Sequence, residues 1–152
     1  MTVDINLKKR VEETGELPLR YSYEGLAWKN VVDNPSFSTG ENEIHFLEKN
    51  LQMVSIFLKG PFCIIHIGIG DGREIPKVAN ALGTKKVMRY VGIDLNPEML
   101  TLASTNAHSI FQKDIFNTVQ LDVEEKGVKP VLEKENLPNE SPRLFLLTGN
   151  SV

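Results

Sequence analysis

The chain has 152 residues, which suffices for one domain with a core and is too short for two domains of ordinary size. Its formal net charge of -3 comes from charges of mixed sign, so no basic face points to a nucleic-acid partner. The single cysteine, Cys63, excludes a disulfide within the chain, and the absence of a leader pattern or a membrane-length apolar run leads us to expect a cytoplasmic location.

Residues 1–60 are predicted to form a helical segment ahead of the main domain. Asp4 is a suitable cap for a short helix. Tyr21, Tyr23 and Trp28 follow in a stretch that is flanked by prolines. Large rings most often fix a segment onto a core, and an aromatic arm that covers a bound ligand is the alternative.

The clearest helical pattern covers residues 43–59. Its apolar residues recur at intervals of three and four, which places them on one face of a helix: Ile44, Leu47, Leu51, Val54 and Leu58. Gly60 and Pro61 then stop the helix. We expect this helix to cover one face of a sheet.

Residues 62–67, Phe-Cys-Ile-Ile-His-Ile, form an apolar run of strand length without helical spacing, which is typical of a buried parallel strand. Glycines follow it at alternate positions, as Gly68, Gly70 and Gly72. Because glycine has no Cβ, the backbone can turn sharply there, and a ligand can lie against bare amide groups at a helix start.

A crossover helix is predicted over residues 73–82, with Pro76 in its first turn. The next apolar run, residues 87–93, delivers Asp94 at a strand end. A carboxylate about twenty residues after a glycine turn can accept hydrogen bonds from both hydroxyls of a ribose. The glycine turn and Asp94 together predict a site for a nucleoside-bearing cofactor.

A second crossover helix is predicted to begin at Asn96-Pro97-Glu98, which is a cap followed by a proline and an acid. The residues expected to face inward from this helix are Met99, Leu100, Leu102 and Ala103. Residues 109–112, Ser-Ile-Phe-Gln, are interpreted as a short third strand, and Asp114 follows them.

Between residues 121 and 136 the chain is charged and weakly periodic, and it supports no more than a helix over residues 131–135. Residues 144–147 are predicted to be a fourth buried strand, which small polar residues 148–151 follow. The alternation of strands and helices predicts an α/β fold with a Rossmann-like parallel sheet, right-handed crossover helices and ligands at the carboxyl ends of the strands.

The spacing of the glycines separates two cofactor classes. A dinucleotide fingerprint, G-x-G-x-x-G, requires a glycine where Arg73 stands, so an NAD-dependent oxidoreductase is the weaker alternative. Gly68-x-Gly70-x-Gly72 followed by Asp94 resembles the nucleotide-binding motif of the Rossmann-like S-adenosylmethionine-dependent methyltransferases. One position that is usually acidic in that family holds His66, which is either a satisfied core histidine or an altered cofactor contact.

This resemblance implies roles for individual residues and S-adenosylmethionine as the cofactor. The implied cofactor contacts are Gly68, Gly70, Gly72, Asp94 and Leu95, with Asp114 near the adenine amino group and Ile115 beside the ring. No catalytic residue is named, because in-line methyl transfer depends mainly on proximity and on a deprotonated acceptor. No metal ion is expected.

Residues 143–152 resemble the start of the fourth-strand motif in the histidine-specific methyltransferase family, whose best-known members methylate the α-amino group of histidine. A complete enzyme of this kind needs more strands than we find, so residues 61–152 would be the first half of the cofactor-binding domain. A small-molecule acceptor such as histidine is then expected. The alternative is a non-catalytic module that pairs its open sheet edge with another copy or with a partner.

Overall fold

The computed structural model describes residues 39–135, 137–138 and 140–148, and the side chains from Ile44 onward. The helix expected after Asp4 and the aromatic arm around Tyr21, Tyr23 and Trp28 lie outside the described residues.

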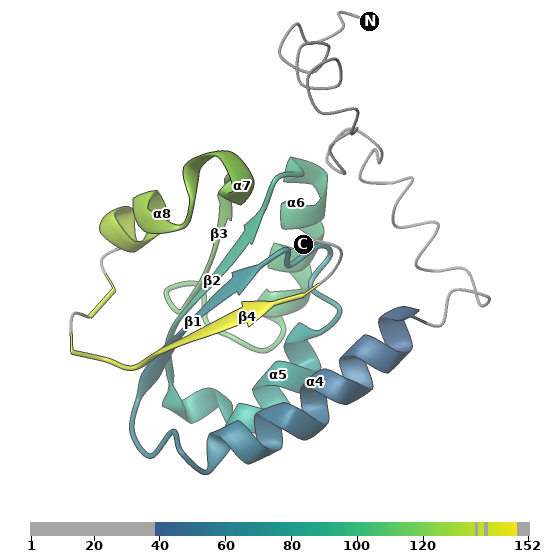
Figure 1. Cartoon of the computed structure of the whole chain (residues 1–152), viewed down its shortest axis with the longest axis vertical. Coiled ribbons are helices and arrows are strands. Elements are labelled where there is room, and N and C mark those ends of the chain that lie inside the picture. The colour runs from purple at the N-terminus through teal and green to yellow at the C-terminus, as the bar shows by residue number, and fades with distance from the viewer. Residues whose placement is uncertain (1–38, 136, 139, 149–152) are drawn as a thin grey trace, which may run out of the picture.

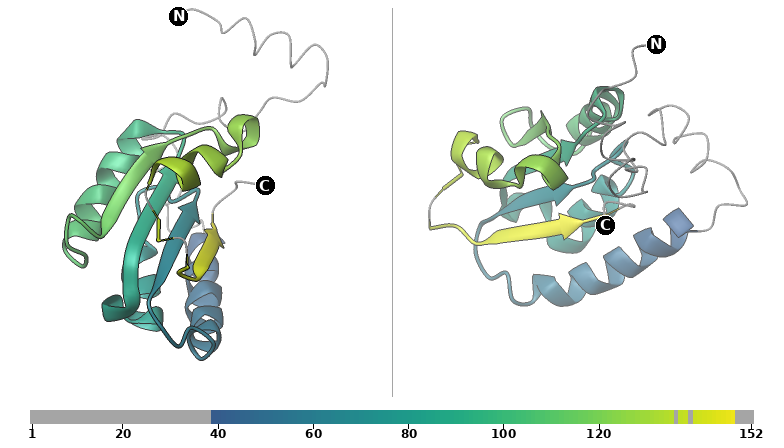
Figure 2. Two further views of the ribbon diagram at one scale, coloured as in Figure 1. Left: turned by 90° about the vertical axis from the view of Figure 1, so that its left-hand side faces the viewer. Right: turned by 45° about the horizontal axis from the view of Figure 1, so that its top comes forward.

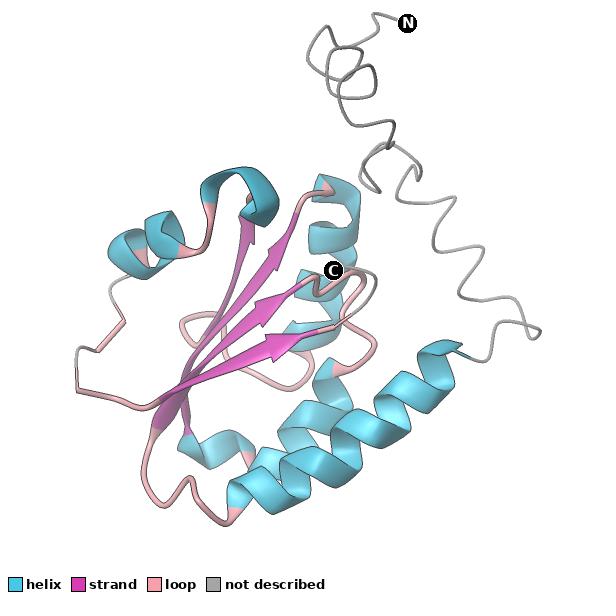
Figure 3. Ribbon diagram, in the orientation of Figure 1, coloured by secondary structure: helices cyan, strands magenta, loops and turns pink. Residues whose placement is uncertain are grey.

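Four parallel strands form the centre of the described part of the chain (Figure 1). They are β1 (Phe62–Ile67), β2 (Val87–Asp94), β3 (Phe116–Gln120) and β4 (Arg143–Leu147). Their order is β3-β2-β1-β4, so the chain winds outward from β1 to β3 and then returns to the other side of β1. The arrowheads in Figure 3 lie at one edge, and the carboxyl end of β1 is the point where the winding direction switches, which is where open α/β sheets bind ligands. The Rossmann-like parallel sheet predicted from the sequence is confirmed.

Helices of different length cover the two faces of this sheet (Figure 2). One face carries α4 (Thr39–Ser55), α5 (Ile75–Leu82) and α6 (Pro97–His108). The short helices α7 (Val123–Lys126) and α8 (Lys129–Lys134) pack on the other face. A single 3-10 turn, η1 (Thr84–Lys86), leads into β2. Alternate residues of β1 therefore point into two cores, with Ile64 in the first and Ile65 in the second.

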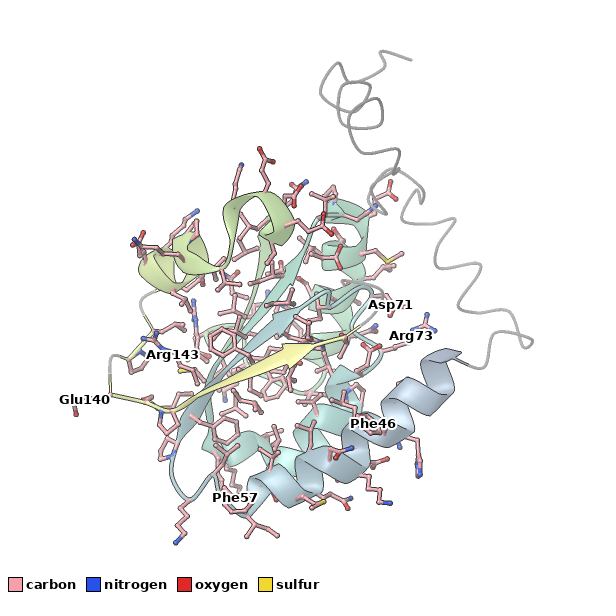
Figure 4. All side chains as sticks on the ribbon, viewed as in Figure 1. Phe46, Phe57, Asp71, Arg73, Glu140 and Arg143 are labelled. Atoms are coloured by element: carbon pink, nitrogen blue, oxygen red, sulfur yellow. The ribbon has the colours of Figure 1, made fainter. Side chains whose placement is uncertain are left out.

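The predicted amphipathic helix is confirmed in α4, although it ends at Ser55 and not at Lys59. Leu51 is buried, and Leu47 and Leu58 pack partly against the same core. The opposite side of α4 and the turn after it expose four large apolar side chains: Phe46, Met53, Ile56 and Phe57. Phe46 and Phe57 mark the two ends of this exposed row in Figure 4.

The start of α6 has the predicted geometry. The Asn96 side chain accepts hydrogen bonds from the backbone N–H groups of Glu98 and Met99 at 2.9 and 3.2 Å. Met99, Leu100 and Ala103 are buried as expected, whereas Leu102 is only half-buried. The sequence thus predicted the cap of α6 and most of its inner face correctly.

The strand predicted at residues 109–112 is wrong. The chain there forms a turn that continues α6, in which the N–H groups of Ile110 and Phe111 donate to the Ala107 carbonyl at 2.9 and 2.8 Å. The buried Phe111 ring packs against Tyr90, with ring centroids 5.5 Å apart. The two apolar residues that suggested a strand therefore anchor the end of a helix, and β3 begins later, at Phe116.

Residues 123–134 contain two short helices, α7 and α8, where a single one was predicted. The Asp122 side chain caps α7 by accepting from the Glu125 N–H at 3.1 Å, and Gly127 ends this helix with a φ of 63°. The predicted helix over residues 131–135 corresponds to α8, which starts earlier because Pro130 is tolerated in its first turn. None of the helices among the described residues has the length and apolar character that crossing a membrane requires.

Candidate functional site

A glycine turn joins β1 to α5 at the carboxyl edge of the sheet. Gly68, Gly70 and Gly72 all have positive φ angles, of 71°, 56° and 74°. The N–H groups of Gly68 and Ile69 both donate to the Ile93 carbonyl, at 2.9 and 3.1 Å. The turn is thereby bound to the end of β2 as soon as it leaves β1.

Gly70 and Gly72 serve different purposes in this turn. A Cβ on Gly72 would lie 2.7 Å from Ile75 Cδ1 and 2.9 Å from Ala103 Cα, so the lack of a side chain lets the turn pack against α6. A Cβ on Gly70 would meet nothing within 4 Å. Gly70 therefore presents bare backbone to open space, which is the arrangement that lets a ligand approach closely.

Ile69 anchors the middle of the turn in the core. Its side chain is buried, and it lies against Gly92 of β2, where a Cβ would come within 2.5 Å of Ile69 Cδ1. Gly92 thus makes room for Ile69, and Ile69 holds the neighbouring Gly70 at the carboxyl edge.

The Asp94 carboxylate is bound to the glycine turn directly. Its Oδ2 accepts from the Gly70 N–H at 2.9 Å, and its Oδ1 accepts from the Asn96 N–H at 3.0 Å. A carboxylate has about four acceptor positions. Two of them remain for other hydrogen-bond donors. The next residue, Leu95, is exposed. The structure therefore brings Gly70 and Asp94 together, as the sequence predicted, while the ribose contact stays a prediction.

An acid and a base within the turn pair with each other. The Asp71 carboxylate accepts from Arg73 Nε at 3.0 Å and from Arg73 Nη2 at 2.7 Å, and both side chains are labelled in Figure 4. The Asp71 carbonyl also accepts from Asn106 Nδ2 at 2.8 Å, which ties the turn to α6. Sequence reasoning assigned no role to this pair, although a charged pair two residues apart inside a glycine turn was the available signal.

Asp114 and Ile115 do not lie at this site. They precede β3, and their carbonyls accept hydrogen bonds from the Arg89 guanidinium and from the Tyr90 N–H respectively. This places both residues at the amino ends of the strands, whereas Gly70 lies at the opposite edge of the sheet, beside the carboxyl ends. The premise that they follow the third strand is wrong, because the strand itself was placed too early in the sequence.

Asp122 occupies the position that Asp114 was expected to fill. The preceding residue, Leu121, donates its N–H to the Asp94 carbonyl at 3.1 Å, so Asp122 follows β3 beside the end of β2. The rule that an acid follows the third strand would have found Asp122 once the strand was placed correctly.

His66 is a satisfied core histidine, the first of the two alternatives. It is fully buried, with Nδ1 2.7 Å from the Tyr90 hydroxyl and Nε2 2.6 Å from Thr148 Oγ1. Burial lowers the pKa of the imidazole from 6.5 to about 3, so the ring is neutral at physiological pH.

The stability of the fold is expected to fall with pH below about 6.5 because of His66. An unfolded chain binds a proton at this imidazole below pH 6.5, whereas the folded chain does not until about pH 3. The contribution of His66 to the free energy of unfolding is therefore fully present above pH 6.5. It decreases by about 1.4 kcal/mol per pH unit as the pH falls toward 3. Denaturant titrations of the parent and His66→Gln from pH 4 to 7 measure this slope, and an equal slope in both proteins would refute the assignment.

Cys63 is buried, and burial raises the pKa of its thiol, so it remains protonated. No cluster of three or more His, Cys, Asp or Glu side chains in the described part of the chain is arranged to hold a metal ion.

Comparison with known proteins gives one family. The family model described as histidine-specific methyltransferase, SAM-dependent, matches residues 7–152. A search of curated proteins finds no match.

Solved structures with a similar arrangement include three S-adenosylmethionine-dependent methyltransferases. Those from Thiobacillus denitrificans and Geobacter sulfurreducens, both in complex with S-adenosyl-L-homocysteine, are each 17% identical, with a TM-score of 0.38, over 54% of this chain and 29% of theirs. The enzyme from Aquifex aeolicus is 19% identical, with a TM-score of 0.44, over 66% of this chain and 48% of its own. This chain thus spans less than half the length of each of these proteins.

Proposed function

The chain belongs to the histidine-specific, S-adenosylmethionine-dependent methyltransferase family, and from this membership we propose that residues 61–152 form its cofactor-binding part, behind a separate N-terminal segment of residues 1–60. The observation that carries the proposal is the open side of Gly70 directly beside the Asp94 carboxylate.

The described residues fit S-adenosylmethionine. Gly70 offers a bare backbone surface, and the remaining acceptor positions of Asp94 suit the two hydroxyls of a ribose. Gly68 and Leu95 complete the proposed contacts, and Gly72 contributes by letting the turn pack on α6. When bound, the cofactor supplies a methyl group on a sulfonium, and the role of the chain's own residues is to bind and orient it.

We assign the adenine amino group to Asp122 in place of Asp114. Asp122→Ser is expected to weaken binding of S-adenosylhomocysteine roughly tenfold, the effect of losing one hydrogen bond to a charged group. Serine retains the cap of α7, so the loss would not come from unfolding of that helix. Asp114→Ser is the matched control and should bind like the parent. Calorimetric titration measures the affinity of both variants for S-adenosylhomocysteine. A larger loss in Asp114→Ser would reverse the assignment.

The proposed methyl acceptor is an amino acid such as histidine, which the family description alone supports, and we propose its amino nitrogen as the methylated atom. The test is incubation of the protein with S-adenosylmethionine and single amino acids, followed by mass spectrometry of the products. Methylated histidine supports the proposal. Methylation of a different amino acid would disprove the histidine assignment and leave the cofactor site intact.

A second candidate function is association through the sheet edge. β4 is an edge strand of the described sheet, and Phe145 and Leu147 are 47% and 58% exposed on it. Edge strands with apolar side chains favour pairing with another chain. We propose a homo-oligomer through this edge, which light scattering tests by comparing the parent with Phe145→Lys. A parent that is monomeric at high concentration would exclude it.

A further inference from the structure

We infer that Thr148 and His66 are positioning residues, which hold the peptide group between Gly68 and Ile69 from the carboxyl end of β4. The geometry stands on its own, whereas its effect on cofactor affinity rests on the proposed function. Neither residue needs to touch the cofactor for this role.

The peptide group between Gly68 and Ile69 is held at both ends. Its carbonyl, on Gly68, accepts from Thr148 Oγ1 at 3.2 Å. Its N–H, on Ile69, donates to the Ile93 carbonyl at 3.1 Å. Because a peptide group is a rigid plane, these two bonds fix the orientation of the turn from β4 on one side and from β2 on the other.

The backbone of Thr148 fixes its own position against the turn. Its N–H donates to the Ile67 carbonyl at 3.2 Å, which continues the pairing of Ile67 with Leu147. The hydroxyl therefore reaches the carbonyl of the next residue, Gly68, without a change of register. Thr148 is 3% exposed, so water does not compete freely for that carbonyl.

His66 sets the direction of the Thr148 hydroxyl. A hydroxyl has one hydrogen, and here it is donated to Gly68, so Thr148 Oγ1 accepts from His66 Nε2–H. This hydrogen-bond network assigns Nδ1 as the acceptor of the Tyr90 O–H. The donors then run in one direction, from Tyr90 through His66 and Thr148 to Gly68, and such chains reinforce each member bond.

Three strands contribute to this chain of hydrogen bonds. Tyr90 comes from β2, His66 from β1, and Thr148 directly follows β4. The series of hydrogen bonds therefore crosses the point where the winding direction of the sheet switches. A change at Thr148 is therefore transmitted to the glycine turn, whose next residues include Gly70.

Amide hydrogen exchange by NMR tests the inference on this chain without any ligand. Thr148→Val removes the hydroxyl while keeping the shape, and the Ile69 amide is expected to exchange roughly fivefold faster, as for the loss of one ordinary hydrogen bond. Thr118→Val is the matched control, because the Thr118 hydroxyl pairs with Ser104 at 3.4 Å and not with the turn. Thr148→Ser should restore slow exchange. Equal Ile69 rates in Thr148→Val and Thr118→Val would overturn the inference.

Two substitutions of His66 independently test the direction in which these hydrogen bonds are donated. The amide nitrogen of glutamine can replace Nε2, whereas that of asparagine replaces Nδ1. His66→Gln should therefore keep Ile69 exchange near that of the parent, and His66→Asn should accelerate it as Thr148→Val does. The opposite order would refute the role of Nε2, even if the threonine variant failed to fold.

Binding of S-adenosylhomocysteine separates this inference from the proposed function. If the parent binds, Thr148→Val should bind about fivefold more weakly, in line with the loosened turn. If the parent does not bind, the proposed function fails, while the exchange rate of Ile69 still decides whether Thr148 and His66 position the turn.

Discussion

Replacing Gly70 with alanine is expected to weaken binding of S-adenosylhomocysteine about 100-fold. The φ of 56° at Gly70 costs an alanine about 1–2 kcal/mol in the folded chain. The new methyl group meets no protein atom within 4 Å, so it projects into the space that we assign to the cofactor. An extra methyl in a filled contact costs about 1–3 kcal/mol, and each 1.4 kcal/mol is about a tenfold change in affinity. Isothermal titration calorimetry together with thermal melting measures both effects.

Gly83→Ala is the matched control for Gly70→Ala. Gly83 has a φ of 80°, and a Cβ there also meets nothing within 4 Å, but it lies after α5, at the opposite end of that helix from the glycine turn. Both variants should lose stability because both glycines have positive φ, and only Gly70→Ala should lose affinity. Unchanged affinity in Gly70→Ala would show that the open side of Gly70 is not the binding surface.

Replacing Asp94 with alanine is expected to abolish measurable binding and to destabilise the fold by about 2 kcal/mol, the usual effect of losing hydrogen bonds to a charged group. The substitution leaves the N–H groups of Gly70 and Asn96 without their carboxylate acceptor. It also removes the acceptors that we assign to the ribose. Calorimetric titration measures the affinity, and denaturant unfolding measures the stability.

Asn96→Ala controls for the loss of stability in Asp94→Ala. It removes the side-chain cap of α6, which costs about 1 kcal/mol, but it leaves the Asp94 carboxylate and the Asn96 backbone in place. This variant should be destabilised and still bind. Affinity in Asp94→Ala within a few-fold of that in Asn96→Ala would contradict the role of the carboxylate.

Most of the sheet and the centre of the site could be predicted because buried parallel strands read as continuous apolar runs. β1 and most of β2 are buried apolar runs, and the glycines and Asp94 stand where these two strands end. β4 was found from its apolar run, but the prediction that it is buried is wrong, because Leu146 is the one buried residue of this strand. The meeting of Gly70 and Asp94 then follows from the fact that carboxyl ends of parallel strands share one edge.

β3 escaped prediction because its residues, Phe-Asn-Thr-Val-Gln, contain no apolar run. The apolar pair Ile110 and Phe111 gave the stronger local signal, although it belongs to the end of a helix. Because the strand was placed too early, Asp114 was predicted at the carboxyl edge of the sheet, although it lies at the amino edge. A short apolar run does not by itself distinguish a strand from a buried helix end.

The surroundings of His66 could not be predicted from local pattern either. Its partners Tyr90 and Thr148 lie 24 and 82 residues away in the sequence and reach it only through the strand order. The sequence therefore left two alternatives for His66, and the register of β1 with β2 and β4 decided between them.

Titration of the unmodified chain with S-adenosylhomocysteine, and separately with NAD, tests the proposed cofactor site most directly. If the glycine turn and Asp94 form a site for S-adenosylmethionine, S-adenosylhomocysteine binds and NAD does not. Binding of NAD without S-adenosylhomocysteine, or of neither, would contradict the proposal that residues 61–152 hold this cofactor.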